Sequence, residues 1–224
     1  MLLSKDKKVF IYLFLLIFLG SINNKNLTVN HIFEIKNLKL DGLNEKEKFN
    51  LLIQLEQIKN KNIFSLPKKT LIEILNSNNL IEVFLINKNY PSDLSIIVKK
   101  TSFLANVNIN GENFLIGSNR KLIKSELINP NLPIVLGSPT IDDFFLIKDN
   151  ILKSSINFND IKKLYFFTSR RWDLELRNGV LIKLPIDASF ETLNSFFKVM
   201  NLSHFKNKDI FDLRVDNQII VNEL

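Results

Sequence analysis

The stretch that decides the fold is Ser169–Pro185, which reads SRRWDLELRNGVLIKLP. Apolar residues alternate with polar ones on both sides of Asn178-Gly179. This pattern, with an Asn-Gly pair between two alternating runs, is typical of two antiparallel strands joined by a tight turn. The stretch therefore predicts a hairpin with one buried face and one exposed face.

The length of the turn follows from which side chains are buried. A two-residue turn would place the two apolar rows of the hairpin on opposite faces of the sheet. A three-residue loop, Arg177–Gly179, pairs Leu176 with Val180 and places both rows on one face. Because a single buried face fixes the register of a strand pair, we predict the three-residue loop, with its glycine at positive φ. Asp173 then lies opposite Lys183 on the outer face.

Other strands and two helices are expected around this hairpin. We predict a hairpin over Asn108–Ile116, a strand within Leu132–Gly137, a helix over Ile141–Ile151, a strand over Lys162–Thr168, a helix over Glu191–Met200, and a final hairpin made of Phe211–Val215 and Gln218–Val221. Strand signals outnumber helix signals here. Residues 104–224 are therefore expected to form a mostly antiparallel β domain with flanking helices.

The preceding segment, 32–103, carries the signals of a smaller module. A strand is expected over Phe33–Leu40, and strands over Ile81–Lys88 and Leu94–Val98 end the module. Between them we predict two helices. The first begins at Asn44 and buries Phe49, Leu52, Leu55 and Ile58, and the second is opened by Ser65 and Pro67 and buries Leu71, Ile74 and Leu75. Asn44 followed by Glu47 is a capping-box pattern. The order β-α-α-β-β predicts a small sheet covered by two helices, so the whole chain is assigned to the α+β class.

The N-terminus contains an uncharged run, Val9–Ile22, preceded by Lys5, Lys7 and Lys8. Positive residues before an apolar run favour a cytoplasmic N-terminus and an exported remainder. We therefore predict a short cytoplasmic tail over 1–8, a single transmembrane helix over 9–22 and a linker over 23–31. A cleaved signal peptide is the alternative, because the run is shorter than most spanning helices. The absence of a small-x-small site after Gly20 favours the uncleaved anchor.

Composition excludes several classes of function. The chain has no cysteine, which excludes disulfides, thiolate nucleophiles and cysteine-based zinc sites. The formal charge is +7, but the lysines are scattered along the chain among Asn and Ile, which indicates compositional bias and no nucleic-acid surface. The two histidines, His31 and His204, do not have metal-ligand spacing. No phosphate-binding loop or nucleophile motif is present, so we predict no enzyme, no catalytic residue, no metal, no cofactor and no small-molecule substrate.

The one arrangement that could suggest catalysis is the Arg170-Arg171 pair, because two guanidinium groups could clamp an anion. An enzyme that acts on anionic envelope compounds would need a concave pocket with polar groups converging on these arginines. The simpler interpretation is that Trp172 lies in the core and that the arginines are solvated or paired.

Several segments resemble the FtsQ/DivIB family of bacterial division proteins. The resemblance is carried by Arg170–Pro185, by Asp212-Leu213-Arg214, by Leu132-Pro133 with Gly137, and by Ile63–Leu66 and Tyr90–Leu94 in a module that resembles a POTRA domain. These segments follow the family's order along essentially the whole chain. The junction departs from the family pattern, because Lys99, Lys100, Ser102, Leu104 and Asn106 stand where the family has Glu, Arg, Pro, Ala and Trp.

The resemblance implies a non-enzymatic scaffold of the divisome. It implies a single-pass protein of the inner membrane, located at the division septum, with a periplasmic C-terminus. It also implies that the protein binds FtsB and FtsL along its last strand and other division proteins through the POTRA-like module. The residues that would contact FtsB are Val215, Asn217, Gln218, Ile219, Ile220 and Val221. The alternative function is a periplasmic POTRA-type chaperone or secretion adaptor with a cleaved signal peptide.

The residues themselves also point to the last strand, because no later strand follows to cover its edge. Two registers of the final hairpin remain open. One register leaves Ile220 facing outward, and the other leaves Ile219 and Val221 facing outward.

Overall fold

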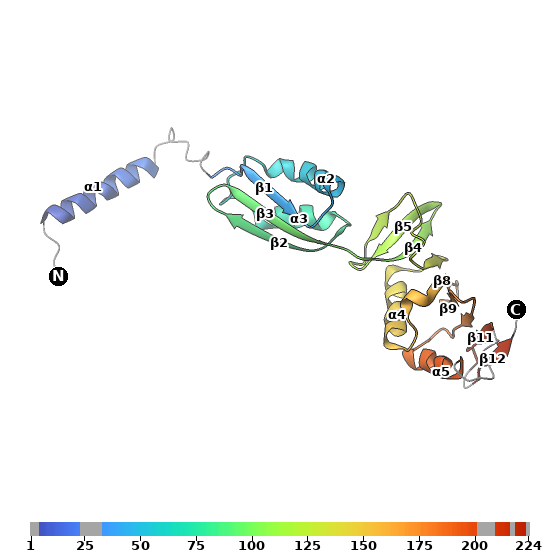
Figure 1. The fold of residues 1–224 in the computed structure, drawn as a ribbon. Helices are drawn as coiled ribbons and strands as arrows, with labels where there is room; N and C mark the ends of the chain where they lie inside the picture. Colours follow the sequence, from blue (N-terminus) through green and yellow to red (C-terminus); the bar gives the residue numbers. More distant parts are fainter. Residues whose placement is uncertain (1–4, 23–32, 201–208, 216–217, 223–224) are drawn as a thin grey trace. The chain divides into compact units, whose positions relative to one another are not determined.

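A computed structural model describes residues 5–22, 33–200, 209–215 and 218–222. The chain divides into two compact units (Figure 1). The first comprises Met1–Asn78 and Phe84–Lys99, and the second comprises Asn79–Val83 and Lys100–Leu224. The expected α+β class is confirmed, because both units combine helices with a β-sheet.

The N-terminal apolar run lies in the helix α1, Lys5–Ile22. Among the described residues, no helix has both the length and the apolar content needed to span a membrane. The prediction of a transmembrane helix over 9–22 is therefore not supported by the structure. The physical reason is that charged residues occupy the first turn of α1, so that the uncharged part is roughly 21 Å long at 1.5 Å per residue, whereas the hydrocarbon core of a bilayer is about 30 Å thick.

The first unit has the expected order of elements. They are β1 (Asn37–Asp41), α2 (Glu45–Leu55) with the 3₁₀ turn η2 (Glu56–Ile58), α3 (Lys68–Ser77), β2 (Ile81–Asn89) and β3 (Asp93–Lys100). The sheet order is β1-β3-β2, with β1 parallel to β3. The capping box is confirmed, because the Asn44 side chain accepts from the backbone N–H of Glu47 at 2.9 Å and the Glu47 carboxylate accepts from that of Asn44 at 3.2 Å.

The predicted buried face of α2 is confirmed at Leu55 and Ile58, and Leu52 is half-buried, but Phe49 does not belong to it. Leu51 and Leu55, four residues apart, are completely buried. Phe49, expected in the core, is 64% exposed. Two residues correspond to about 200° of rotation around a helix, so Phe49 and Leu51 cannot both face the sheet. The leucines take the core position.

The described residues of the second unit form a nine-stranded sheet with the order β12-β11-β10-β9-β8-β7-β4-β5-β6. Its strands are β4 (Phe103–Ile109), β5 (Glu112–Gly117), β6 (Leu122–Lys124), β7 (Ile134–Leu136), β8 (Ile161–Phe166), β9 (Trp172–Leu176), β10 (Leu181–Lys183), β11 (Ile210–Asp212) and β12 (Ile220–Asn222). Most pairings are antiparallel. The parallel pairs are β4 with β7, β7 with β8, and β10 with β11.

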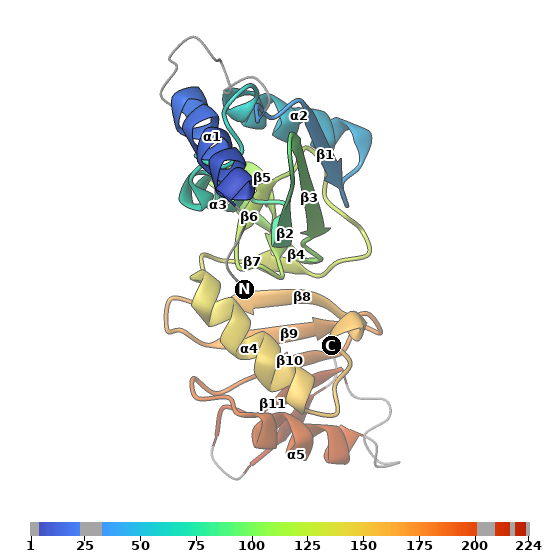
Figure 2. The same ribbon diagram turned by 90° about the vertical axis from the view of Figure 1, so that its left-hand side faces the viewer.

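Two helices cover one face of this sheet. They are α4 (Ile141–Lys153) and α5 (Phe190–Met200), and the short turn η3 is Phe158–Asp160. Figure 2 shows α4 lying across β8, β9 and β10, and α5 beside β11. A row of apolar residues runs across six strands beneath the helices: Val135, Leu164, Leu174, Ile182, Phe211 and Val221. This row forms part of the core of the second unit.

The hairpin formed by β9 and β10 confirms the predicted register. The Leu176 N–H donates to the Val180 carbonyl at 2.8 Å, and Gly179 has φ +95°. Asp173 lies opposite Lys183. Leu176 and Val180 are both buried, which is the physical reason for the three-residue loop.

Candidate functional site

The last two strands form the edge of the large sheet. β11 pairs in parallel with β10 on one side and antiparallel with β12 on the other. In the part of the chain that the structure describes, β12 has no neighbouring strand on its outer side. The N–H and C=O groups of such an edge can pair with a strand of another chain.

The register of this pair decides between the two alternatives left open by the sequence. Phe211 lies opposite Val221 and is fully buried, with its ring centroid 5.0 Å from that of Phe196 in an edge-to-face arrangement. Ile219 and Val221 are partly buried against the core. Ile220 is 43% exposed. The structure therefore has the register in which Ile220 faces outward.

A charged row lies on the outer face beside Ile220. Asp212 stands opposite both Ile220 and Lys183, and Lys183 stands opposite Asp173. The Arg214 Nε donates to Asp212 Oδ1 at 2.8 Å, and its backbone N–H donates to the same oxygen at 3.1 Å. These hydrogen bonds lower the pKa of Asp212. The carboxylate therefore stays ionised and fixes Arg214 beside the edge.

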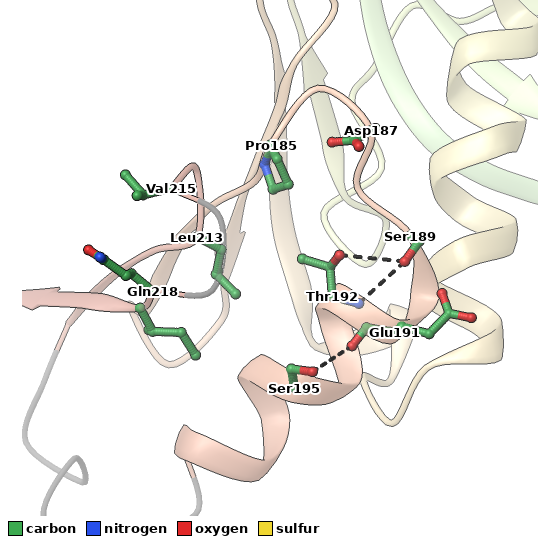
Figure 3. A pocket seen from close by; sticks show the side chains of 10 residues that line it. Pro185, Asp187, Ser189, Glu191, Thr192, Ser195, Leu213, Val215 and Gln218 are labelled. Atoms are coloured by element: carbon green, nitrogen blue, oxygen red, sulfur yellow. Dashed lines mark hydrogen bonds between the residues drawn. The ribbon is translucent and has the colours of Figure 1, made fainter.

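A pocket of about 660 Å³ adjoins the edge (Figure 3). Figure 3 shows Leu213, Val215 and Gln218 on one side and Thr192 and Ser195 of α5 on the other. The complete lining is Pro185, Asp187, Ser189, Glu191, Thr192, Ser195, Leu213, Val215, Gln218 and Ile219. The hairpin side is mainly apolar and the helix side is mainly polar, so the pocket suits a side chain with an apolar body and a polar end.

The polar side of the pocket is held by the start of α5. The Thr192 N–H donates to Ser189 Oγ at 3.4 Å, so that Ser189 caps the helix. Ser195 Oγ donates to the Glu191 carbonyl at 2.9 Å. These local bonds orient the hydroxyl groups and leave the Glu191 carboxylate as an acceptor at the rim.

The structure brings together most of the predicted partner-binding residues. Val215, Gln218 and Ile219 line the pocket, and Ile220 and Val221 lie in β12. Asn217 lies outside the described residues. The sequence did not point to Thr192 or Ser195, because nothing in the local pattern of α5 links it to a hairpin some twenty residues later in the chain.

The two arginines considered for an enzyme do not converge on one pocket. Arg170 donates to Asp143 Oδ1 at 2.6 Å beside α4. Arg171 stacks on the Phe167 ring at 4.3 Å, and its Nε lies 3.3 Å from Asp173 Oδ1. A pocket of about 150 Å³ is lined by Arg170 and not by Arg171. The simpler interpretation of this pair is confirmed: both arginines are paired, and Trp172, only 6% exposed, lies in the core.

An ionic network lies further along the same outer face. Glu175 accepts from the Tyr165 hydroxyl at 2.6 Å, and its oxygens lie 2.9 Å from Lys162 Nζ and 3.1 Å from Lys163 Nζ. Chiefly because of the Tyr165 hydrogen bond, the pKa of Glu175 falls to about 2. Burial raises the pKa of Asp173, and the Arg171 guanidinium opposes this effect. These groups are engaged with one another, which is typical of a structural network.

Neither histidine can be assigned a position, because His31 and His204 lie outside the described residues. Among the residues that are described, no three His, Asp or Glu side chains gather as metal ligands would.

Sequence comparisons with known proteins agree on one family. Residues 105–214 match the family model "Cell division protein FtsQ/DivIB, C-terminal". The chain is 24% identical over 195 residues to the cell division protein FtsQ of Rickettsia bellii (strain RML369-C), a match that covers 85% of this chain and 73% of that protein. A similar solved structure is the major extracytoplasmic domain of the trans isomer of the cell division protein DivIB from Geobacillus stearothermophilus. Its TM-score is 0.34 at 11% identity, over 48% of this chain and 92% of that chain.

The family match has a boundary that matters for the site. It includes β9, β10 and Asp212–Arg214 and ends one residue before Val215. The edge strand β12 and all six predicted partner-binding residues therefore lie beyond the matched segment.

Proposed function

Because this chain matches the FtsQ/DivIB family of cell division proteins, we propose that it is a non-enzymatic scaffold of the divisome that recruits FtsB and FtsL through the edge strand β12. The observation that carries the proposal is the outer edge of β12, which no other described strand pairs with, and the exposed side chain of Ile220 beside it. An extended segment can add to such an edge through main-chain hydrogen bonds, while side-chain pockets supply specificity.

The pocket beside α5 supports the same role. A strand added to β12 would run beside Val215, Gln218 and Ile219, which already line the pocket. One side chain of the partner segment can enter the pocket while its backbone pairs with β12. The combination of an edge and an adjoining pocket gives both affinity and register.

The proposal also includes the other parts of the chain. The first unit, with its POTRA-like order of elements, is proposed to bind other division proteins.

Association with the inner membrane at the septum is proposed through α1, with both units in the periplasm. Every large apolar side chain from Val9 to Leu19 is exposed on α1. An exposed apolar surface of this kind is typical of a membrane or protein contact.

Hydrogen–deuterium exchange tests the strand-addition step directly. The full chain in detergent micelles is compared with and without the soluble ectodomains of FtsB and FtsL. We expect slower amide exchange within Ile220–Asn222 in the complex, because the N–H groups that point away from β11 become hydrogen-bonded to the added strand. Binding without protection of these amides, or no binding at all, would refute the proposed role of β12.

A further inference from the structure

A second groove lies in the first unit, between β1 and α2. Figures 1 and 2 both show these two elements side by side. The cavity has a volume of about 640 Å³. Its lining is Ile35, Lys36, Asn37, Leu38, Lys39, Phe49, Leu52, Ile53, Leu55, Glu56, Ile58 and Lys59. We refer to it as the β1–α2 groove.

One wall of the groove is the outer edge of a strand. Among the described strands, β1 pairs with β3 alone, on its inner side. Just before β1, the Ile35 N–H donates to the Lys61 carbonyl at 3.0 Å, and the Asn60 N–H donates to the Ile35 carbonyl at 3.2 Å. Within the described ranges, no strand continues this pairing along Asn37–Asp41. A row of backbone groups in an edge strand is matched best by another extended backbone.

The other wall is an apolar stripe of α2 that the core of the first unit does not use. Phe49 and Ile53 lie four residues apart on one face of the helix and are 64% and 54% exposed. Leu51 and Leu55, both fully buried, already hold α2 on the sheet. The two exposed side chains are therefore available to cover the apolar residues of an added strand.

The rim of the groove is positively charged. Lys36, Lys39 and Lys59 line it and are exposed, and Glu56 is the one acidic residue among the lining residues. Complementary charge favours acidic residues in whatever occupies the groove.

From these features we infer that the β1–α2 groove binds an extended segment of a partner protein with alternating apolar and acidic side chains. The segment adds to the outer edge of β1, places its apolar side chains against Phe49 and Ile53, and directs its carboxylates to the lysines of the rim. The inference rests on the proposed scaffold function and specifies the chemistry of the partner that the first unit accepts. The groove and the β12 edge belong to different units, so their occupants are distinct.

A peptide selection tests this inference. Short random peptides are displayed on phage and selected on the full-length chain in detergent micelles. The parallel targets are the Ile53→Glu variant, the Lys39→Glu variant and the matched control Ile97→Glu, which changes another exposed apolar residue of the same unit. We expect the wild type and Ile97→Glu to enrich peptides with alternating apolar and acidic residues.

The two groove variants give different expected results. Ile53→Glu should weaken binding of the best selected peptide by about tenfold or more, because it removes an apolar contact and adds a repelling charge. Lys39→Glu should shift the selection away from acidic peptides. Methylation of alternate backbone nitrogens in that peptide should also abolish its binding, because strand addition needs those N–H groups.

Four outcomes would overturn the inference: no enrichment on the wild type, enrichment of basic peptides, enrichment that Ile53→Glu leaves unchanged, or binding that tolerates backbone methylation. The affinity of each variant for the FtsB and FtsL ectodomains is measured in parallel. If the selection fails but the wild type binds FtsB and FtsL, the inference about the β1–α2 groove is refuted and the proposed function stands. If the wild type does not bind FtsB and FtsL, the proposed function is refuted.

Discussion

Ile220 lies directly opposite Asp212 where β12 pairs with β11, at the outer edge of the nine-stranded sheet. Their neighbours Phe211 and Val221, also opposite each other, face the helices. Because side chains alternate along a strand, burial of Phe211 leaves Ile220 exposed. The core of the second unit thus determines which side chain the edge presents to a partner.

The first prediction concerns this exposed isoleucine. Ile220→Lys should weaken binding of the FtsB and FtsL ectodomains by at least about tenfold, because it places a charge in an apolar contact. The fold should remain intact, because the new cation lies opposite Asp212 and cross-strand pairs of opposite charge are stabilising. Isothermal titration calorimetry measures the affinity, and circular dichroism checks the fold.

Leu152→Lys is the matched control for this variant, since Leu152 is 56% exposed on α4. It should bind FtsB and FtsL as the wild type does. Unchanged affinity of a folded Ile220→Lys variant would exclude β12 as the binding edge.

The second prediction concerns the pocket beside α5. Ser195→Trp should place a large ring in the cavity of about 660 Å³ and compete with the partner side chain. We expect about tenfold weaker binding of the FtsB and FtsL ectodomains, with little loss of stability because Ser195 is exposed. Ser195→Ala, which leaves the cavity open, should bind normally. Equal affinity of the two variants would show that the pocket stays empty in the complex.

The third prediction compares two glycines at positive φ. A Cβ added at Gly179 would meet open space, whereas a Cβ added at Gly137 would clash with the backbone carbonyl of Phe166. Gly179→Ala should cost about 1–2 kcal/mol in the free energy of unfolding, from backbone strain alone. Gly137→Ala should cost about 2–5 kcal/mol, because strain and a steric clash combine.

Urea unfolding followed by Trp172 fluorescence measures both values. Trp172 is the single tryptophan of the chain and reports on the second unit. Equal losses for the two variants would contradict the close packing of Gly137 against β8.

The fourth prediction concerns the pH dependence of stability. Glu175 has a pKa of about 2 in the folded chain, against an ordinary value of 4.5. A lowered folded-state pKa contributes stability above pH 4.5, and this contribution is lost as the pH falls from 4.5 toward 2, because the unfolded chain takes up the proton first. At pH 7, Glu175→Gln should be less stable than the wild type by about 1–3 kcal/mol.

Urea unfolding of both proteins at several pH values between 7 and 2 checks this difference. It should stay constant above pH 4.5 and shrink below it. A difference that is independent of pH would mean that Glu175 stabilises the fold through packing alone. Tyr165→Phe removes the largest contribution to the pKa shift of Glu175. This variant should also be less stable than the wild type, by a smaller amount than Glu175→Gln, and its loss of stability should likewise shrink below pH 4.5.

Local patterns predicted several elements well. The hairpin of β9 and β10, the positive φ of Gly179 and the capping box at Asn44 all follow from residues close together in the sequence. Alternation, turn chemistry and capping act over a few residues, so that neighbouring residues are sufficient to specify them.

Predictions that depended on distant residues were less accurate. Phe49 was placed in the core because its spacing fits an apolar face with Leu55, but Leu51, which was not predicted, takes the contact with the sheet beside Leu55. Asn106 was noted only as a departure from the family pattern. Its amide Nδ2 donates to the Asn129 carbonyl at 2.8 Å, and its Oδ1 accepts from the Asn129 N–H at 2.8 Å. A buried amide is satisfied here by a loop far along the chain.

The sequence by itself determined the α+β class, the register of the central hairpin and the resemblance to the FtsQ/DivIB family. Only the tertiary structure decided that Ile220, and not Ile219, faces outward, and that α5 completes a pocket beside the edge. The reason is that the order of strands and the packing of Phe211 against Phe196 depend on contacts between residues far apart in the chain. Such contacts leave no periodic signal in the local sequence.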